Sequence, residues 1–298
     1  KVKRGKIAMN DILIPKSCNY IGVFLTFSCS LSCSYCINRY SNTKFSHSKL
    51  LGREWVSILT RIKIDPSMQD NLPITLQGGE PTLHPDFYEI VNGIRSDLNI
   101  DLLTNLQFDV KEFMRNVYPN RLCRNAPYAS IRVSYHPEAD YLDLFGKVLA
   151  LLDAGYSVGV WSVLHPEYID HILEVQEYAK ILGIDFRTKE FLGVYKSKLC
   201  GIYKYYDACN QDMVFDAQCK TSELLIGPNG QVYKCHRDLY KNENIIGDMF
   251  KNNYHINFEY RNCSNYGQCN PCDIKLKYDR FQKTGHCSVD IKMGGNNE

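Results

Sequence analysis

The stretch of sequence that decides the fold is residues 20–36, YIGVFLTFSCSLSCSYC. Its first part, residues 20–27, is apolar and rich in β-formers, which is typical of a buried parallel strand. Cys29, Cys33 and Cys36 follow at once, in the spacing Cys-x3-Cys-x2-Cys. Because α/β folds place their chemistry at the C-terminal ends of parallel strands, three thiols in this loop indicate a metal site.

This strand is the first of six strand–helix units. Apolar strands are predicted at residues 20–27, 73–77, 99–104, 129–135, 157–164 and 184–192. Helices with apolar residues at helical spacing are predicted at residues 50–62, 86–94, 109–117, 140–154 and 167–182. Units of this length imply parallel strands joined by right-handed crossovers. Both an open doubly wound sheet and a partial barrel of six units fit this pattern.

The composition is that of an ordinary globular protein. Of 298 residues, 44% are hydrophobic and 23% charged, so we expect one large α/β domain with at most a small appendage. Lys and Arg (35) nearly balance Asp and Glu (33), which gives no support for nucleic acid or a membrane surface as a partner. The lack of a run of about 18 apolar residues excludes a membrane span. Residues 1–10 have no apolar stretch of the signal-peptide kind, so a cytoplasmic location is expected.

A second group of cysteines lies in a different kind of sequence. From about residue 215 the helical periodicity fades, and residues 224–226 and 231–234 flank a Gly-Pro-Asn-Gly turn that predicts a hairpin. The cysteines of this segment are Cys219, Cys235, Cys263, Cys269, Cys272 and Cys287. Because such a segment is expected to bury little apolar surface, bound metal would supply the missing stabilisation.

The chemistry of the first cysteine group is open from its spacing alone. Three thiolates on one loop can hold three corners of a [4Fe-4S] cluster and leave the fourth iron free for a ligand. With a distant fourth ligand such as His47, the same thiolates would hold zinc. The second predicted strand ends in Gly78-Gly79-Glu80-Pro81.

These two motifs together resemble the radical S-adenosylmethionine (SAM) superfamily, over roughly residues 20–192. The motifs are Cys-x3-Cys-x-aromatic-Cys after the first strand and Gly-Gly-Glu-Pro after the second. The resemblance implies a partial (β/α)6 barrel and a [4Fe-4S] cluster on Cys29, Cys33 and Cys36. The open iron of that cluster would take the amino and carboxylate groups of SAM.

The resemblance also implies roles for side chains around that cluster. Residues expected to line the methionine amino group of SAM are Gly78, Gly79 and Glu80. Tyr35 is expected near the adenine, although a core aromatic fits this position nearly as well. Other strand ends supply candidate contacts to SAM or substrate, namely Asn105, Ser134 and Arg187.

The second cysteine group resembles the auxiliary-cluster domains of radical SAM enzymes, called SPASM and Twitch. The resemblance lies in Cys219-x10-Gly230-x4-Cys235, followed by a Cys-x2-Cys pair. It implies one auxiliary [4Fe-4S] cluster on Cys219, Cys235, Cys269 and Cys272, with Cys263 able to replace one ligand. A zinc ribbon is the alternative. The implied organisation is a lead-in at residues 1–19, the barrel at 20–214 and the auxiliary domain at 215–298.

The function that the resemblance implies is reductive cleavage of SAM to a 5′-deoxyadenosyl radical, which abstracts a hydrogen atom from a substrate carbon. A net oxidation of a small polar metabolite, assisted by the auxiliary cluster, is the preferred prediction. Only 19 residues precede the first strand, which lowers the expectation of a ribosomal peptide substrate. An external one-electron reductant of the flavodoxin or ferredoxin type is expected as a partner.

Three alternatives to this oxidation stay open. The first is modification of a ribosomally made peptide, by cross-linking or epimerisation. In an epimerisation a free thiol returns the hydrogen atom, and the candidate donors are Cys123, Cys200, Cys209 and Cys287. The non-enzymatic alternative is a structural or electron-transfer protein that holds zinc or an iron–sulfur cluster.

Overall fold

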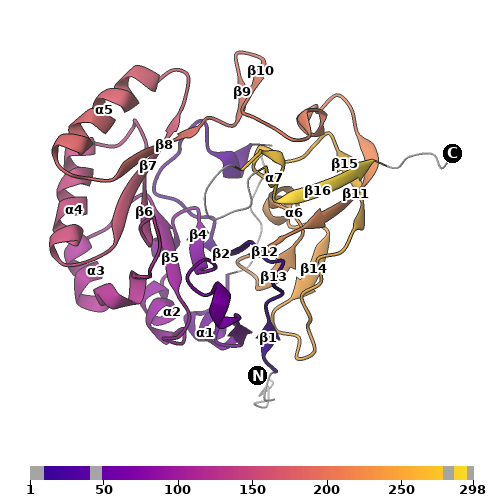
Figure 1. Cartoon of the computed structure of the whole chain (residues 1–298), viewed down its shortest axis with the longest axis horizontal. Coiled ribbons are helices and arrows are strands. Elements are labelled where there is room, and N and C mark those ends of the chain that lie inside the picture. Colours follow the sequence, from indigo (N-terminus) through magenta and orange to yellow (C-terminus); the bar gives the residue numbers. More distant parts are fainter. Residues whose placement is uncertain (1–9, 41–48, 278–284, 294–298) are drawn as a thin grey trace.

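The computed structural model describes residues 10–40, 49–277 and 285–293. Its largest sheet has nine strands in the order β14-β13-β12-β2-β4-β5-β6-β7-β8 (Figure 1). The strands from β2 to β8 are parallel neighbours in chain order. They correspond to the six predicted strands: β2 (Tyr20–Thr26), β4 (Ile74–Gly78), β5 (Ile100–Thr104), β6 (Ile131–Tyr135), β7 (Val158–Leu164) and β8 (Phe186–Glu190).

Five helices connect these strands, each within a few residues of its prediction. They are α1 (Gly52–Leu59), α2 (Phe87–Gly93), α3 (Val110–Asn116), α4 (Tyr141–Asp153) and α5 (Ile169–Ile181). Figure 1 shows α3, α4 and α5 on the side of the sheet away from the C-terminal elements. Asp140 begins α4, because its carboxylate accepts a hydrogen bond from the Leu142 amide. The helices bury apolar side chains against the strands, and these side chains form one continuous core.

The first helix ends earlier than predicted. Residues up to 62 were expected in it, but α1 stops at Leu59, and Ile62 and Lys63 form a short strand, β3 (Ile62–Lys63). This strand pairs with β1 (Ile12–Leu13), which lies in the predicted lead-in. Pairing with a distant segment therefore overrides the local helical pattern at these two residues.

The predicted hairpin is present but belongs to the main sheet. Its strands are β12 (Glu223–Ile226) and β13 (Gln231–Tyr233), and β14 (Ile245–Asp248) follows. β12 pairs in parallel with β2 and is wholly buried, so the expectation that this segment buries little apolar surface is wrong. β2 is buried on both faces and needs a partner for its second edge, which β12 provides. The predicted boundary at residue 215 thus does not separate the main sheet from the rest of the chain.

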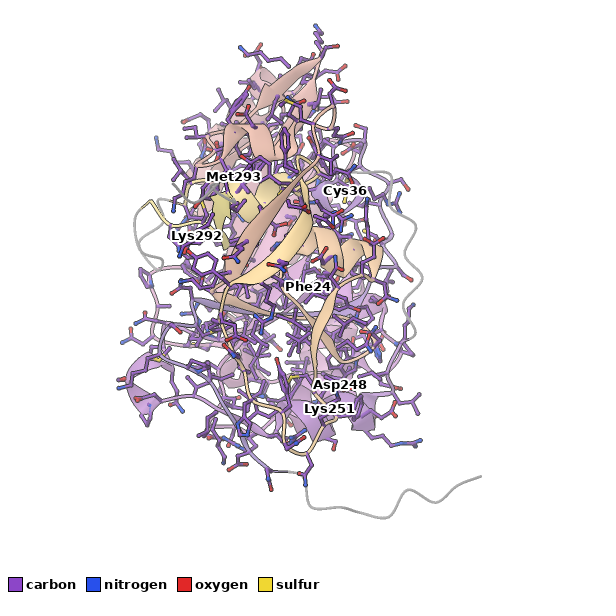
Figure 2. All side chains as sticks on the ribbon, turned by 90° about the vertical axis from the view of Figure 1, so that its right-hand side faces the viewer. Phe24, Cys36, Asp248, Lys251, Lys292 and Met293 are labelled. Atoms are coloured by element: carbon purple, nitrogen blue, oxygen red, sulfur yellow. The ribbon has the colours of Figure 1, made fainter. Side chains whose placement is uncertain are left out.

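The remaining C-terminal elements form a smaller layer. A three-stranded sheet has the order β15-β11-β16, from β11 (Phe215–Thr221), β15 (Arg261–Tyr266) and β16 (Val289–Met293). The short helices α6 (His236–Lys241) and α7 (Pro271–Ile274) lie beside it (Figure 1). Figure 2 views this side, with Lys292 and Met293 of β16 above Asp248 and Lys251 at the end of β14. Within the described ranges, no helix combines the length and apolar character needed to cross a bilayer.

Candidate active site

A cavity of about 350 Å³ opens at the C-terminal ends of the parallel strands. Among its lining residues are most of those that the sequence singled out: Cys29, Cys33, Tyr35, Cys36, Gly78, Gly79, Asn105 and Ser134. They come from the loop after β2 and from the ends of β4, β5 and β6. The parallel register of these strands places their C-terminal ends together, which is why residues far apart in sequence share one wall.

The cysteine loop is held by backbone and amide contacts. The Cys36 amide donates to the Cys33 carbonyl at 3.2 Å, which turns the loop between these two thiols. The side-chain amide nitrogen of Asn105 (Nδ2) donates to Ser30 Oγ at 3.0 Å and contacts Cys29 Sγ at 3.6 Å. Burial, followed by the nearby Glu138 carboxylate and the neighbouring thiols, raises the pKa of Cys33 to about 12. Binding of a metal centre would therefore release a proton there.

The glycine turn is required by the cysteine loop itself. The Gly79 amide donates to the Thr26 carbonyl at 2.8 Å, so the turn after β4 lies directly against the end of β2. A Cβ on Gly79 would lie 2.3 Å from the Ser28 carbonyl oxygen and 2.6 Å from that of Phe27. Gly78 has a φ of +145° and equally close backbone neighbours. These glycines therefore allow two backbone segments to approach, in addition to any role toward SAM.

The close approach at Gly79 leads to a prediction for Gly79→Val. The valine side chain would push the residue 27–29 backbone away, so we expect iron content to fall toward half and SAM affinity to fall about tenfold or more. Iron analysis and equilibrium dialysis of SAM measure the two effects. Gly146→Val is the matched control, because a Cβ at Gly146 on α4 meets nothing within 4 Å. Unchanged iron and unchanged SAM binding in Gly79→Val would contradict this account of the turn.

Glu80 was predicted to line the SAM site together with Gly78 and Gly79, but it is not among the residues that line the cavity. Its side chain is 1% exposed and accepts hydrogen bonds from the Thr82 amide and hydroxyl, from Thr104 Oγ1 at 2.9 Å and from the Asn105 amide at 2.7 Å. Burial raises its pKa, while these donors lower it. The carboxylate thus ties the end of β5 to the turn after β4, and it holds two residues that line the cavity, Thr104 and Asn105.

Arg187 also lies elsewhere. It forms an ion pair with Asp185 at 2.7 Å and donates to the Pro127 carbonyl, near the N-terminal ends of β8 and β6. It stands close to the beginning of its strand, too far from the C-terminal ends to reach the cavity. Lys189 and Glu190, at the other end of β8, line the cavity instead.

Two histidines lie beside Tyr35, and one of them, His136, lines the cavity. The Tyr35 hydroxyl and His136 Nδ1 share a hydrogen bond of 2.9 Å, and the His165 ring lies 5.0 Å from the Tyr35 ring between centroids. Burial raises the pKa of Tyr35 and lowers those of His136 and His165, so these three side chains are uncharged at neutral pH. His136 and His165 follow the fourth and fifth predicted strands, and strand ends of this kind were the remaining candidates for contacts to SAM or substrate. The signal that pointed to them was their position alone.

A larger cavity of about 690 Å³ adjoins the first. The two share Tyr35, Cys36, Ile37, Arg39, Phe191 and Leu192 as lining residues. Its outer wall comes from the hairpin of β9 (Gly193–Tyr195) and β10 (Lys198–Cys200) and from η5 (Tyr206–Cys209). Of the four candidate hydrogen donors, Cys209 lines this cavity, whereas Cys123, Cys200 and Cys287 line neither of the two.

The second cysteine group is gathered around a small buried core. Cys209, Cys219 and Cys235 belong to this core, and Cys263 and Cys269 pack against it. Cys219 and Cys263 stand on the adjacent strands β11 and β15, and a hydrogen bond from the Cys219 thiol lowers the pKa of Cys263. Cys272 instead lines the smaller cavity together with Cys36. Cys263, the alternative ligand of the sequence analysis, thus packs against the same core as Cys219, Cys235 and Cys269, and the choice between Cys263 and Cys272 stays a prediction.

The comparisons with known proteins agree with this picture of the fold. No family model matches the chain. It is 22% identical over 210 residues to a GTP 3',8-cyclase of Listeria monocytogenes serotype 4b, covering 65% of this chain and 62% of the relative. It is 26% identical over 189 residues to a GTP 3',8-cyclase of Helicobacter pylori strain 26695, covering 58% and 56%. The chain therefore spans about three fifths of the length of these curated relatives.

Among solved structures, the chain resembles native anSMEcpe with bound AdoMet and Kp18Cys peptide. The TM-score is 0.51 at 14% sequence identity, with 77% of each chain covered. A likeness of this degree concerns the fold alone.

Proposed function

The chain belongs to the radical SAM superfamily, and from this membership we propose that it cleaves SAM reductively and abstracts a hydrogen atom from a substrate carbon. The observation that carries the proposal is the convergence of the three cysteines, the glycine turn, Asn105 and Ser134 on one cavity. A protein that only transfers electrons would not need these polar SAM-binding groups opposite its cluster.

The residues of this cavity fit a [4Fe-4S] cluster with bound SAM. Cys29, Cys33 and Cys36 are free thiols on one loop, which suits a cluster with one open iron. Bound there, the cluster would supply the electron that cleaves the sulfonium of SAM to methionine and a 5′-deoxyadenosyl radical. Cys29 is exposed, which gives an external flavodoxin- or ferredoxin-type reductant in the cytoplasm a short path to this edge.

The other cavity residues would bind and orient SAM. Gly78 and Gly79 present backbone rather than side chains to the methionine end, and Asn105 and Ser134 offer hydrogen-bonding groups at neighbouring strand ends. Tyr35 and His136, with His165 packed against Tyr35, would lie beside the adenine and keep water from the reacting carbon.

We extend the proposal to the architecture of the chain. The six parallel strands would form a partial (β/α)6 barrel. The strands β11, β15 and β16, with the loops between them, would form a SPASM/Twitch-like layer. The linear strand order, which leaves β8 at an open edge, supports a barrel that is incomplete.

For the second cysteine group we assign one auxiliary [4Fe-4S] cluster to Cys219, Cys235, Cys263 and Cys269. All four contact one buried core, which supports this set over one that includes Cys272. A zinc ribbon on the same thiols is the alternative.

The larger cavity is the proposed substrate chamber. Its polar side chains include Arg39, Asp207, Asn210, Gln211 and Asp212, so it suits a small metabolite rich in hydrogen-bonding groups. Net oxidation of that substrate, with the auxiliary cluster as electron acceptor, is the reaction we favour. Epimerisation is the second candidate, and the observation that favours it is the Cys209 thiol in the chamber wall.

The proposal is tested on the wild-type protein purified without oxygen. It should be brown, hold about eight iron atoms per chain, and form 5′-deoxyadenosine from SAM and dithionite. Iron analysis, the absorption near about 400 nm and product chromatography measure this. A colourless protein loaded with zinc, or an iron-loaded protein that leaves SAM intact, would overturn the proposal.

A further inference from the structure

A chain of two hydrogen bonds connects a C-terminal helix to the glycine turn. Tyr240 lies on α6, and its hydroxyl donates to Asn38 Oδ1 at 2.7 Å. The Asn38 amide nitrogen in turn donates to the Gly78 carbonyl at 2.8 Å. Asn38 stands in η1 (Ile37–Arg39), the short turn that directly follows Cys36. One amide side chain therefore joins the cysteine loop, the glycine turn and α6.

This amide is fixed in orientation because both of its ends are used. Its oxygen accepts from Tyr240 and its nitrogen donates to Gly78, so a rotated amide would set its oxygen against the Gly78 carbonyl oxygen and its N–H group against the donating Tyr240 hydroxyl. Tyr240 is itself held firmly, with a side chain 4% exposed whose ring packs on Phe24 and Phe27 at centroid distances of 6.1 and 5.7 Å. The rigid tyrosine therefore fixes the direction of the Gly78 carbonyl through Asn38.

A second link joins the same turn to the C-terminal cysteines. Asn270, between Cys269 and Cys272, donates to the Ile37 carbonyl at 3.0 Å. Its side-chain oxygen accepts from the Cys272 amide at 2.9 Å and begins α7. α6 begins directly after Cys235. Both links therefore start from a segment that follows a predicted ligand of the auxiliary cluster, and both meet η1, the turn after Cys36.

We propose that Tyr240 and Asn270 are positioning residues through which the C-terminal cysteine segment shapes the SAM cavity. The inference rests on the proposed function, because it assumes that SAM binds against Gly78 and Gly79. It adds that the auxiliary segment supports SAM binding mechanically, separately from any transfer of electrons. Tyr240 acts through Asn38 on the Gly78 carbonyl, and Asn270 holds the backbone after Cys36.

The test is Tyr240→Phe in the full chain with both clusters loaded. Loss of one hydroxyl removes one hydrogen bond, so we expect SAM affinity to fall about three- to tenfold while iron content stays at the wild-type value. Equilibrium dialysis measures the affinity. The change in the electron paramagnetic resonance spectrum of the reduced protein on addition of SAM gives a second reading that does not depend on turnover.

Tyr233→Phe is the matched control. Tyr233 is equally buried in the same aromatic group, but its hydroxyl contacts Asn229 and Asn242 rather than the SAM cavity. It should bind SAM as the wild type does. Asn38→Asp provides an independent variant, because it keeps an acceptor for Tyr240 and removes the donor to Gly78, so it should weaken SAM binding at least as much.

The outcomes separate this inference from the proposed function. Wild-type SAM affinity in Tyr240→Phe and Asn38→Asp, with iron intact, would overturn the link. Loss of iron from Tyr240→Phe would also overturn it, because the tyrosine would then hold the cluster rather than the cavity. If iron-loaded wild-type protein does not bind SAM, the proposed function itself fails.

Discussion

Replacing Cys29, Cys33 and Cys36 together by alanine is expected to abolish formation of 5′-deoxyadenosine from SAM and dithionite. These three thiols line the smaller cavity, which is also lined by the glycine turn. Of the two cavities described above, the larger one is not lined by this turn. The C-terminal thiols contact a separate buried core, so their cluster should survive. Iron should therefore fall by about half, from about eight to about four atoms per chain.

The control for this experiment removes cysteines that line neither cavity. Cys123 is exposed and Cys200 half-buried, so Cys123→Ala with Cys200→Ala should keep both the iron and the product. Persistent 5′-deoxyadenosine in the triple variant would contradict the assignment of the first cluster. A fall of iron to zero would show that the C-terminal thiols do not hold a cluster by themselves.

The parallel sheet could be predicted because its signal is local. The strands β2, β4, β5, β6 and β7 are each followed in the chain by a helix, and periodicity detects these strand–helix units. The pairing of β12 with β2 could not be predicted in this way, since about two hundred residues separate them. The tetrapeptide Glu223–Ile226 reads as half of a hairpin from the sequence, and only the free edge of β2 makes it a central strand.

The candidate site shows the same division between local and spatial information. Cysteine spacing and the glycine pair mark the loops that form the cavity, since those motifs are contiguous in the chain. Where a side chain points is a different question. Glu80 is adjacent to Gly79, yet its carboxylate turns into the protein, where three neighbouring residues supply donors. Arg187 has the right chemistry but stands at the wrong end of β8.

Tyr240, Asn38 and Asn270 belong to no motif, so no sequence pattern distinguishes them from their neighbours. Their importance arises from contacts between residues as far apart as Asn38 and Tyr240, which hydropathy and spacing do not encode. The Asn38 side chain bridges two loops, and this contact can be recognised only when the positions of both loops are known. Such supporting contacts decide how accurately a site holds its ligand.

The ligands of the auxiliary cluster give the second prediction with a large effect. Cys235→Ala and Cys263→Ala are each expected to lose the second cluster, with iron falling to about four atoms per chain, while 5′-deoxyadenosine still forms at saturating SAM. The first cluster alone faces the proposed SAM cavity, so reductive cleavage does not need the second. Cys272→Ala should keep about eight iron atoms, because Cys272 lines that cavity instead of the buried thiol core.

The comparison of Cys263→Ala with Cys272→Ala decides between the two ligand sets. Both thiols are half-buried, so loss of packing affects them alike. If Cys272→Ala loses iron while Cys263→Ala keeps it, the ligands are the four of the original prediction: Cys219, Cys235, Cys269 and Cys272. Metal also stabilises this layer, so the variants must be compared as soluble protein with matched circular dichroism.

If Cys235→Ala stays folded, loses the cluster and still turns over a substrate fully, an auxiliary role in oxidation is excluded. A redox-neutral epimerisation, with Cys209 at the chamber wall as hydrogen donor, then becomes the better assignment.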